Sequence, residues 1–478
     1  IDTPARDRAQ AWVFGWIDRF GRGRGPGWTP DLTGRRLIRW INHALFLLNG
    51  QEKPRTEAFF QSLGQQTIFL SRRWTSASPG LPRFEALTGL IYAGLSLTGM
   101  ERFVVSASAA LAKECARQID ADGGIPTRNP EELLEVFTLL TWAAAALGQA
   151  GDVPPHVEHL AAIERIAPTL RALRHSDGAL ARFHGGGRGL EGRLDQALAD
   201  AGVRALPPHG LAMGFARMSA GRTSVLVDAA PPTFGPPSAN AHASTLAVEL
   251  TSGRRPLIVN CGSGGTFGSG WHRAGRATPM HSTLGIVGYS SSRLAPQQEN
   301  RPEHLTDGPK NVRVQTSSGL DGTTLIVSHD GYAGTHGLTH VRQLDLSLDG
   351  RTLRGEDTLG ALSGAERKRF ERVLRRSGVT GVPFEIRFHL HPDVDAKLDM
   401  GGTAFSMTLK SGEVWVIRHD GVAQMRLDPS VYLEKGRLKP RDAQQIVLSA
   451  EVVEYAFQTG WTFAKAQDTP QAIRDLTR

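Results

Sequence analysis

The sequence contains very little cysteine. Its 478 residues include two, Cys115 and Cys261, and these lie in segments of different character. A disulfide is therefore not expected, and cysteine usage leaves the redox compartment open.

Long hydrophobic runs are also lacking. No apolar stretch reaches the roughly 18–20 residues that a helix needs to span a bilayer, so no membrane span is expected. The chain begins at Ile1, without a methionine and without the apolar core of a signal peptide. The expected location is the cytoplasm, or the periplasm if an export signal has been removed, and the sequence does not separate the two.

Motifs for nucleotides and nucleic acids are missing as well. No GxxxxGK[ST] phosphate loop occurs, and no basic run carries interleaved aromatic residues. Yet 55 Lys and Arg residues against 47 Asp and Glu residues give a formal net charge of +8. Most of these cations are arginines, which bind carboxylates and sulfates through two hydrogen bonds. The expected partner is therefore an acidic oligo- or polysaccharide and not a nucleic acid, and the oligomeric state stays open.

Two kinds of pattern follow one another along the chain. A chain of 478 residues is too long for one ordinary core, so two domains are expected. Residues 1–205 carry apolar residues at i, i+3 and i+4 spacing, in segments separated by Gly, Pro and Asp. About seven or eight such helices with short connectors predict an incomplete α/α toroid more than a four-helix bundle.

Residues 206–478 have a different character. Their segments are short, alternate between apolar and polar residues, and are separated by turns such as SLDG and KSG. This pattern predicts a large antiparallel β-sandwich. The predicted fold class is therefore α+β, with a toroid over 1–205, a sandwich over 206–478, and the ligand site in the cleft between them.

Residues 240–281 are the most informative stretch. They place His242, Asn260 and His281 where three predicted strands of one sheet can bring them together. Two imidazoles and an amide or carboxylate that converge from neighbouring strands can hold a divalent metal through nitrogen and oxygen. The alternative is a pair of hydrogen-bonded sheet histidines and a turn asparagine.

The same stretch resembles the heparinase II/III-like polysaccharide lyases. The motifs that carry the resemblance are NAHAS at 240–244, VNCG at 259–262 and WHRAGRATPMH at 271–281. The resemblance implies a zinc ion on His242, Asn260 and His281, although the family has an aspartate where this chain has Asn260. It also places Asn240 where the family has a histidine that is a candidate for catalysis. No organic cofactor is expected. The residues expected to bind substrate are Asn240, Trp271, Arg273, Arg276 and, in a glycine-rich segment, Arg188.

The resemblance extends into the helical half, through Glu85, the DGG at 122–124 and Arg128. It implies β-elimination of a uronate-containing glycan, in which an amide or a cation neutralises the carboxylate while other groups act as base and acid. In this chain Arg128 is the expected neutralising group, and Glu85 or His184 is the expected base. The expected acid is Tyr289 or Tyr332.

Two other functions remain open. Glu85 and Glu132 begin helices that the resemblance directs into one groove, and glycoside hydrolysis needs such a pair of carboxylates, with Arg128 to hold one ionised. The alternative for both is a charge that stabilises the first turn of its helix. The remaining possibility is a catalytically silent glycan-binding protein of the cell envelope.

Overall fold

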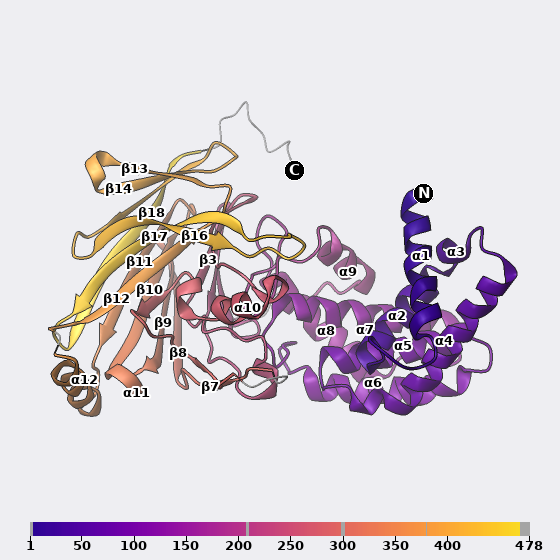
Figure 1. The fold of residues 1–478 in the computed structure, drawn as a ribbon. Coiled ribbons are helices and arrows are strands. Elements are labelled where there is room, and N and C mark those ends of the chain that lie inside the picture. The colour runs from indigo at the N-terminus through magenta and orange to yellow at the C-terminus, as the bar shows by residue number, and fades with distance from the viewer. Residues whose placement is uncertain (1–2, 207–209, 298–301, 379, 469–478) are drawn as a thin grey trace. The chain divides into compact units, whose positions relative to one another are not determined.

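The computed structural model describes residues 3–206, 210–297, 302–378 and 380–468 (Figure 1). The chain divides into two compact units. The first comprises residues 1–125, 132–168 and 195–206, and the second comprises 126–131, 169–194 and 207–478. The change from helical to strand pattern falls at the end of the first unit. Two segments before this change, 126–131 and 169–194, belong to the second unit.

The described residues before 207 form nine α-helices. They are α1 (Thr3–Phe20), α2 (Pro30–Asn42), α3 (Ala44–Leu48), α4 (Lys53–Arg73), α5 (Leu81–Ser96), α6 (Val104–Gln118), α7 (Pro130–Ala150), α8 (Val157–Ala172) and α9 (Arg193–Ala201). The segment RLIRWINHALFLLN, expected as one helix, is interrupted at His43, whose φ of −110° and ψ of 17° end α2 and precede α3.

Helices α2 and α5 approach each other unusually closely because each has a glycine at the crossing. A Cβ on Gly34 would lie 2.2 Å from the carbonyl oxygen of Glu85, and a Cβ on Gly89 would lie 2.5 Å from Cα of Gly34. The two backbones therefore touch directly, and the side chain of Glu85 is buried beside this crossing.

Helix α7 meets the length and hydropathy expected of a membrane span, contrary to the expectation that no segment would. However, 56% of its most apolar window is buried inside the protein. A core helix of a folded domain has the same properties, so this one helix is weak evidence for a membrane span.

The second unit contains two eight-stranded sheets, and every strand pair in them is antiparallel. The first sheet has the order β1 (Phe215–Ala220), β2 (Thr223–Asp228), β3 (Val248–Ser252), β4 (Arg255–Val259), β12 (Val382–Leu390), β17 (Arg441–Val452) and β16 (Gln424–Tyr432), with β5 (Leu284–Ile286) paired to β12. The second has the order β13 (Asp395–Asp399), β14 (Ala404–Thr408), β15 (Val414–His419), β18 (Ala456–Gln467), β11 (Thr352–Gly360), β10 (Leu338–Ser347), β9 (Gly322–Tyr332) and β8 (Val312–Gly319). A short ribbon joins β6 (Arg293–Leu294) and β7 (Leu305–Asp307).

One apolar core joins the two sheets. Phe388 of the first sheet packs against Trp461 and Phe463 of the second, with ring centroids 4.7 Å and 5.1 Å apart. Inward residues alternate with outward ones along strands such as β11, as in other sandwiches.

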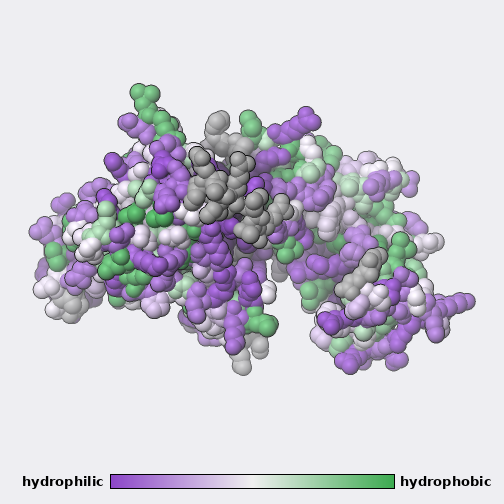
Figure 2. Space-filling view, turned by 90° about the horizontal axis from the view of Figure 1, so that it is seen from above, coloured by the Kyte–Doolittle hydropathy of each residue, from purple (hydrophilic) through white to green (hydrophobic). Residues whose placement is uncertain are grey.

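Figure 2 shows that hydrophilic residues cover most of one face of the molecule, with hydrophobic residues in separate small patches. Helices followed by antiparallel sheets confirm the α+β class.

Three short helices connect strands of the second unit. Helix α10 (Ser269–Gly275) lies between β4 and β5, α11 (Ala333–His336) between β9 and β10, and α12 (Gly364–Ser377) between β11 and β12. The first of these, with the glycine-rich segment before it, forms part of the candidate site.

Candidate functional site

A pocket lies beside the glycine-rich segment 262–270 of the second unit. Its volume is about 450 Å³, within the range of about 300–1,000 Å³ that small-ligand sites usually have. The lining residues include an amide, an imidazole, an ammonium group and several hydroxyls, but no carboxylate among the residues that the structure describes there. They are Gly185, Asn240, Ser263, Gly265, Thr266, Gly268, Ser269, His272 and Lys435.

Glycines give this segment its shape. Gly262 has a φ of 94°, and a Cβ there would lie 2.1 Å from the guanidinium of Arg182. A Cβ on Gly264 would lie 2.0 Å from the carbonyl oxygen of Trp271. The segment therefore packs against the start of α10 in a way that side chains would prevent, and this packing holds His272 at the pocket.

His272 and Asn240 form a hydrogen-bonded pair on the pocket wall. Nε2 of His272 lies 3.3 Å from Oδ1 of Asn240. Since an amide oxygen only accepts, Nε2 carries the proton and Nδ1 keeps its lone pair. Burial, and then the nearby charge of Arg276, lower the pKa of His272. The imidazole is therefore neutral at physiological pH and can take a proton through Nδ1.

Lys435 brings a positive charge to the same pocket. Its ammonium group is paired with the carboxylate of Glu131, which also accepts a hydrogen bond of 2.8 Å from the backbone N–H of Gly187. The side chain of Lys435 is 43% exposed, so solvent and an anionic ligand can both reach the cation.

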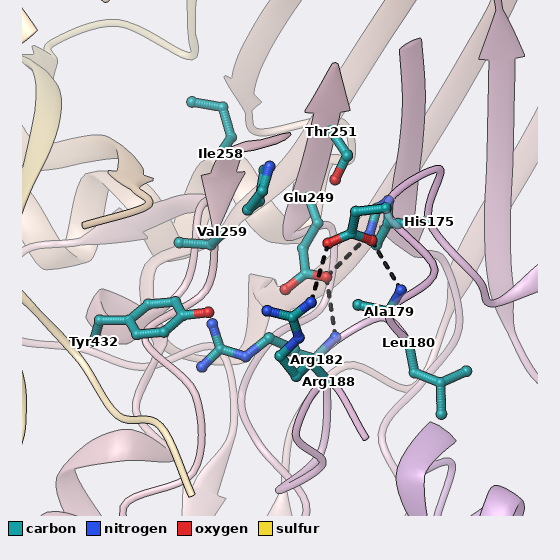
Figure 3. A pocket seen from close by; sticks show the side chains of 12 residues that line it. His175, Ala179, Leu180, Arg182, Arg188, Glu249, Thr251, Ile258, Val259 and Tyr432 are labelled. Atoms are coloured by element: carbon teal, nitrogen blue, oxygen red, sulfur yellow. Dashed lines mark hydrogen bonds and ion pairs between the residues drawn. The ribbon is translucent and has the colours of Figure 1, made fainter. Parts of the chain in front are cut away.

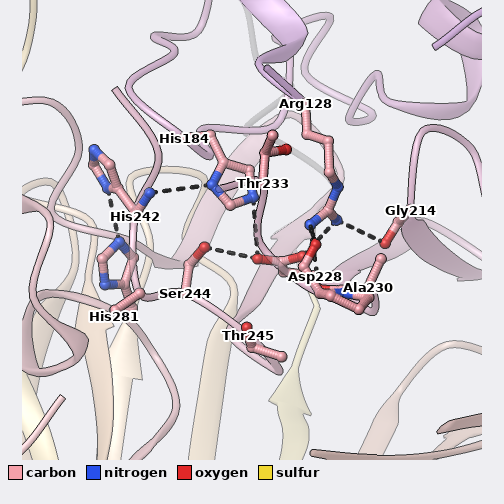
Figure 4. Close-up of polar contacts among 12 residues, drawn as sticks. Arg128, His184, Gly214, Asp228, Ala230, Thr233, His242, Ser244, Thr245 and His281 are labelled. Atoms are coloured by element: carbon pink, nitrogen blue, oxygen red, sulfur yellow. Dashed lines mark hydrogen bonds and ion pairs between the residues drawn. The ribbon is translucent and has the colours of Figure 1, made fainter. Parts of the chain in front are cut away.

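Arg128, His184 and Asp228 form a buried network next to this region (Figure 4). Asp228 binds Nη2 of Arg128 at 2.6 Å and the hydroxyl of Ser244 at 2.7 Å, and its Oδ2 lies 3.3 Å from Nε2 of His184. Burial alone would raise the pKa of Asp228, but the charge of Arg128 and the contacts with His184 and Ser244 outweigh it and hold the pKa well below its usual value. Asp228 is therefore ionised, although it was not singled out from the sequence.

Arg128 has a structural task that conflicts with the role expected for it. Besides Asp228, its guanidinium donates to four carbonyl oxygens at 3.0–3.2 Å, those of Met213, Gly214, Ala230 and Pro231. All five N–H groups are thus used. No donor remains to neutralise a uronate, so this arrangement does not support Arg128 as a substrate-binding or catalytic group.

His184 is held in a similar way. It is 1% exposed, and its Nδ1 accepts a hydrogen bond of 3.2 Å from the backbone N–H of His242. Burial lowers the pKa of His184, and the neighbouring Asp228 opposes this only in part. The imidazole is neutral, but both nitrogens face protein groups, which leaves it poorly placed as a base for a substrate.

His242 and His281 lie together, as expected, but bind each other. Nδ1 of His242 is 2.9 Å from Nε2 of His281, whose Nδ1 is 2.9 Å from the carbonyl oxygen of Ala277. The carbonyl fixes a proton on Nδ1 of His281, so Nε2 of His281 accepts from His242. Burial lowers the pKa of His281 to about 4 and that of His242 well below its usual value. Both imidazoles are neutral at physiological pH.

The third expected zinc ligand is engaged elsewhere. Oδ1 of Asn260 accepts a hydrogen bond of 3.0 Å from the backbone N–H of Ser282, and its Nδ2 donates to Glu249 at 3.2 Å. Burial raises the pKa of the adjacent Cys261 thiol to about 11, so it is not a thiolate. No group of three or more His, Cys, Asp or Glu residues suited to a metal occurs among the described residues. The residues present do not fit a zinc ion.

Glu249 belongs to a second polar cluster (Figure 3). It accepts hydrogen bonds from His175 at 3.2 Å and from the backbone N–H of Arg182 at 3.0 Å. Arg188 lines the cavity beside it, but that cavity has a volume of only about 20 Å³, enough for about one water molecule. This cavity is therefore too small for a sugar. Arg188 could bind a sugar only through the solvent-exposed part of its side chain, which is 49% exposed.

The other residues expected to bind substrate in this region differ in their exposure to solvent. Arg276 is buried and donates to the carbonyl oxygens of Ala241, Glu303 and Ser238 at 2.8 Å each, so it stabilises the loop. Arg273 is paired with the Glu303 side chain at 2.7 Å but is half-exposed, and Trp271 is 37% exposed. The latter two can contact a ligand.

The two expected acids differ. Tyr332 is fully buried, its hydroxyl donates to the carbonyl oxygen of Leu284 at 3.3 Å, and burial raises its pKa, which makes it unsuitable as an acid. Tyr289 is 48% exposed and packs edge-on against His336 at 4.5 Å. It is not among the residues that line the pocket.

Glu85 and Glu132 belong to the first unit. Glu85 is 4% exposed and forms an ion pair with the half-exposed Arg35, while its Oε2 is buried without a hydrogen-bond partner among the described residues. Burial raises the pKa of Glu85 to about 7 in spite of Arg35. Glu132 lies in the first turn of α7 and is partly buried. Their pairing as hydrolase carboxylates stays a prediction.

Comparisons with known proteins identify the family. A family model described as "Heparinase II/III-like, C-terminal" matches residues 203–462. A curated relative, FtsZ-localized protein C of Caulobacter vibrioides (strain NA1000 / CB15N), is 32% identical over 471 residues, which cover 96% of this chain and 78% of the relative. The chain belongs to the heparinase II/III-like family.

Solved structures agree with this assignment. A mutant heparan sulfate lyase from Pedobacter heparinus matches with a TM-score of 0.63 and 16% identity, over 98% of this chain and 74% of that one. A heparinase III matches with a TM-score of 0.70 and 11% identity, over 97% and 74%. A Paenibacillus xanthan lyase matches with a TM-score of 0.54 and 8% identity, over 96% and 51%. These matches confirm the expected fold, a toroid followed by a sandwich.

This chain has Asn240 where the family pattern has a histidine. The side chain of His272 is hydrogen-bonded to Asn240. The sequence predicted no role for His272, although it stands between Trp271 and Arg273 in the motif WHRAGRATPMH. Its position directly after a glycine-rich turn, where functional residues concentrate, was the signal that could have found it.

Proposed function

We propose that the pocket at Asn240, His272 and Lys435 binds an acidic sugar and cleaves it by β-elimination. The supporting observation is a neutral imidazole beside an amide and a cation, in a pocket without carboxylates among its described lining residues. Nδ1 of this imidazole has no hydrogen-bond partner within the described part of the chain. This set suits a ligand that carries its own negative charge.

The chemistry follows from these groups. Lys435 and Asn240 are placed to hold the uronate carboxylate, which makes the proton on C5 easier to remove. Nδ1 of His272 takes that proton, the C5–H electron pair forms the C4–C5 double bond, and the C4–O bond breaks. The imidazolium then returns its proton to the departing oxygen.

A product assay with two readouts tests this proposal. The protein is incubated with uronate polysaccharides while ultraviolet absorbance of the unsaturated product and new reducing ends are both recorded. We expect both signals to rise, and His272→Ala to lower the rate by about 10²–10⁴-fold, the usual contribution of a positioned base. His156→Ala, which removes an exposed histidine elsewhere, is the matched control. Reducing ends without absorbance would instead indicate the hydrolase, and full activity of His272→Ala would exclude the proposed base.

A non-catalytic glycan-binding protein is the second candidate function. It is favoured by Arg128 and Tyr332, whose polar groups are used inside the fold, and by the relative whose name states a location with FtsZ and no reaction. Saturable glycan binding without either product signal would select it. The cellular location, cytoplasm or periplasm, stays a prediction.

A further inference from the structure

Helix α12 is strongly basic. Its sequence, GAERKRFERVLRRS, contains six Arg or Lys residues against two Glu residues. All six cationic side chains are exposed: Arg367, Lys368, Arg369, Arg372, Arg375 and Arg376. The helix connects β11 of one sheet to β12 of the other, and Figure 1 shows it at one end of the sandwich near α11.

The fold holds α12 firmly at this position. Ser363 forms a capping box with Glu366, and Gly378 ends the helix in the left-handed conformation with a φ of 63°. Phe370 is 2% exposed, and Val373 and Leu374 pack partly buried against the sandwich core. The apolar side of the helix is therefore covered by the protein itself.

The cations lie together on the opposite side. At 3.6 residues per turn, five of them fall within an arc of about 120° and span about 12 Å along the axis: Lys368, Arg369, Arg372, Arg375 and Arg376. No acidic residue of the helix lies in this arc. We call these five residues the basic stripe.

Much of the charge in the basic stripe is uncompensated. Arg375 is paired with Glu371 at 2.9 Å, and Arg369 donates to the carbonyl oxygen of Gly334 at 2.6 Å. Lys368, Arg372 and Arg376 make no hydrogen bond or ion pair with any described residue. These three exposed cations, without hydrogen-bonded or ion-paired partners among the described residues, produce a positive potential outside the helix.

We propose that the basic stripe is a binding site for a linear acidic polysaccharide, separate from the pocket at His272. Arginine binds carboxylate and sulfate groups through two hydrogen bonds, and a helical row of arginines presents such donors at successive positions along a chain. This site goes beyond the proposed reaction, because binding there requires no turnover.

The structure favours a glycan over two other polyanions. The apolar face of α12 is packed on the core, so the helix has no free apolar face to insert into a bilayer. The basic stripe contains no aromatic residue on which nucleic acid bases could stack. What it offers is charge and bidentate hydrogen bonding alone.

A binding experiment on the full chain tests the proposal. Heparin, anionic phospholipid vesicles and single-stranded DNA are titrated at several salt concentrations. We expect heparin to bind most tightly, and R372E/R376E to weaken it at least tenfold at low salt and to reduce the salt dependence. The matched control, R254E/R313E, reverses two exposed arginines elsewhere in the same unit and should change affinity less than twofold.

Each other result overturns the proposal. Equal losses in both double variants would mean that only net charge matters, and preferred binding to vesicles or DNA would identify a different partner. Circular dichroism is the control that tests whether R372E/R376E is folded. The variant His272→Ala should bind heparin at the basic stripe as the unaltered protein does, so failure of the pocket proposal leaves this result interpretable.

Discussion

At the scale of single residues, burial without full pairing determines which groups titrate near neutrality. Glu85 is the clearest example in the helical unit, since its Oε2 has no hydrogen-bond partner among the described residues and its pKa is raised to about 7. Between the ordinary carboxyl pKa and 7, the folded protein therefore binds more protons than the unfolded chain, and the free energy of unfolding falls as pH rises through this window.

Replacing Glu85 by Gln should remove this pH dependence. Relative to the unaltered protein, E85Q should gain stability between about pH 5 and 8, by at most about 3 kcal/mol because one pKa unit corresponds to 1.36 kcal/mol, and by less because Gln loses the ion pair with Arg35. Urea unfolding across this range measures the difference. Glu57→Gln, an exposed glutamate of α4, should show no such trend, and equal trends in both variants would contradict the assignment.

The contacts of single residues also argue against a metal ion at His242 and His281. Each imidazole has its hydrogen-bonding partner within the protein, and Asn260 is held by Ser282 and Glu249. We expect the purified protein to contain far less than one zinc per chain by elemental analysis, and its Tm to be insensitive to chelators. Near-stoichiometric zinc that is lost in H242A but retained in H156A would show that the pair is a ligand set after all.

At the scale of elements, the close packing of α2 and α5 depends on glycines that have no side chain at the crossing. Gly34→Ala should force α2 away from α5, because the new methyl group would meet the backbone of Glu85. The expected loss is about 1–3 kcal/mol, typical of overpacking.

Gly148→Ala in α7 is the matched control, because a Cβ there meets nothing within 4 Å. It should be neutral or stabilise by up to about 1 kcal/mol through helix propensity. Thermal unfolding of both variants measures the contrast, and similar destabilisation by the two would contradict the proposed crossing.

At the scale of the whole molecule, two compact units with separate cores predict two unfolding transitions. Gly34→Ala should lower only the transition of the helical unit. Asp228→Asn should lower only that of the sandwich unit, by about 3–5 kcal/mol, because it leaves Arg128 buried without its counter-charge. Calorimetry of the two variants and their combination tests this, and one transition that both variants shift equally would contradict it.

Much of the fold could be predicted because it rests on periodic patterns. Apolar spacing in the first 205 residues and alternation thereafter are local properties, and they gave the correct order of helices and antiparallel strands. The break at His43 was missed because the apolar spacing continues across it, and only the local backbone conformation ends α2.

The site was less predictable. The motif predicted that His242 and His281 lie together, since each lies a few residues before a strand of one sheet, β3 and β5. It did not show that Asn260 turns toward Glu249, that five backbone and side-chain acceptors occupy Arg128, or that His272 reaches Asn240.

By itself, the sequence therefore determined the family, the order of the elements and the neighbourhood of the histidines. The tertiary structure decided which side chains are free to react. The reason is physical: periodicity and motif are set by neighbours in the chain, whereas burial, pKa and the saturation of hydrogen bonds are set by residues that are distant in sequence and meet only in the folded protein.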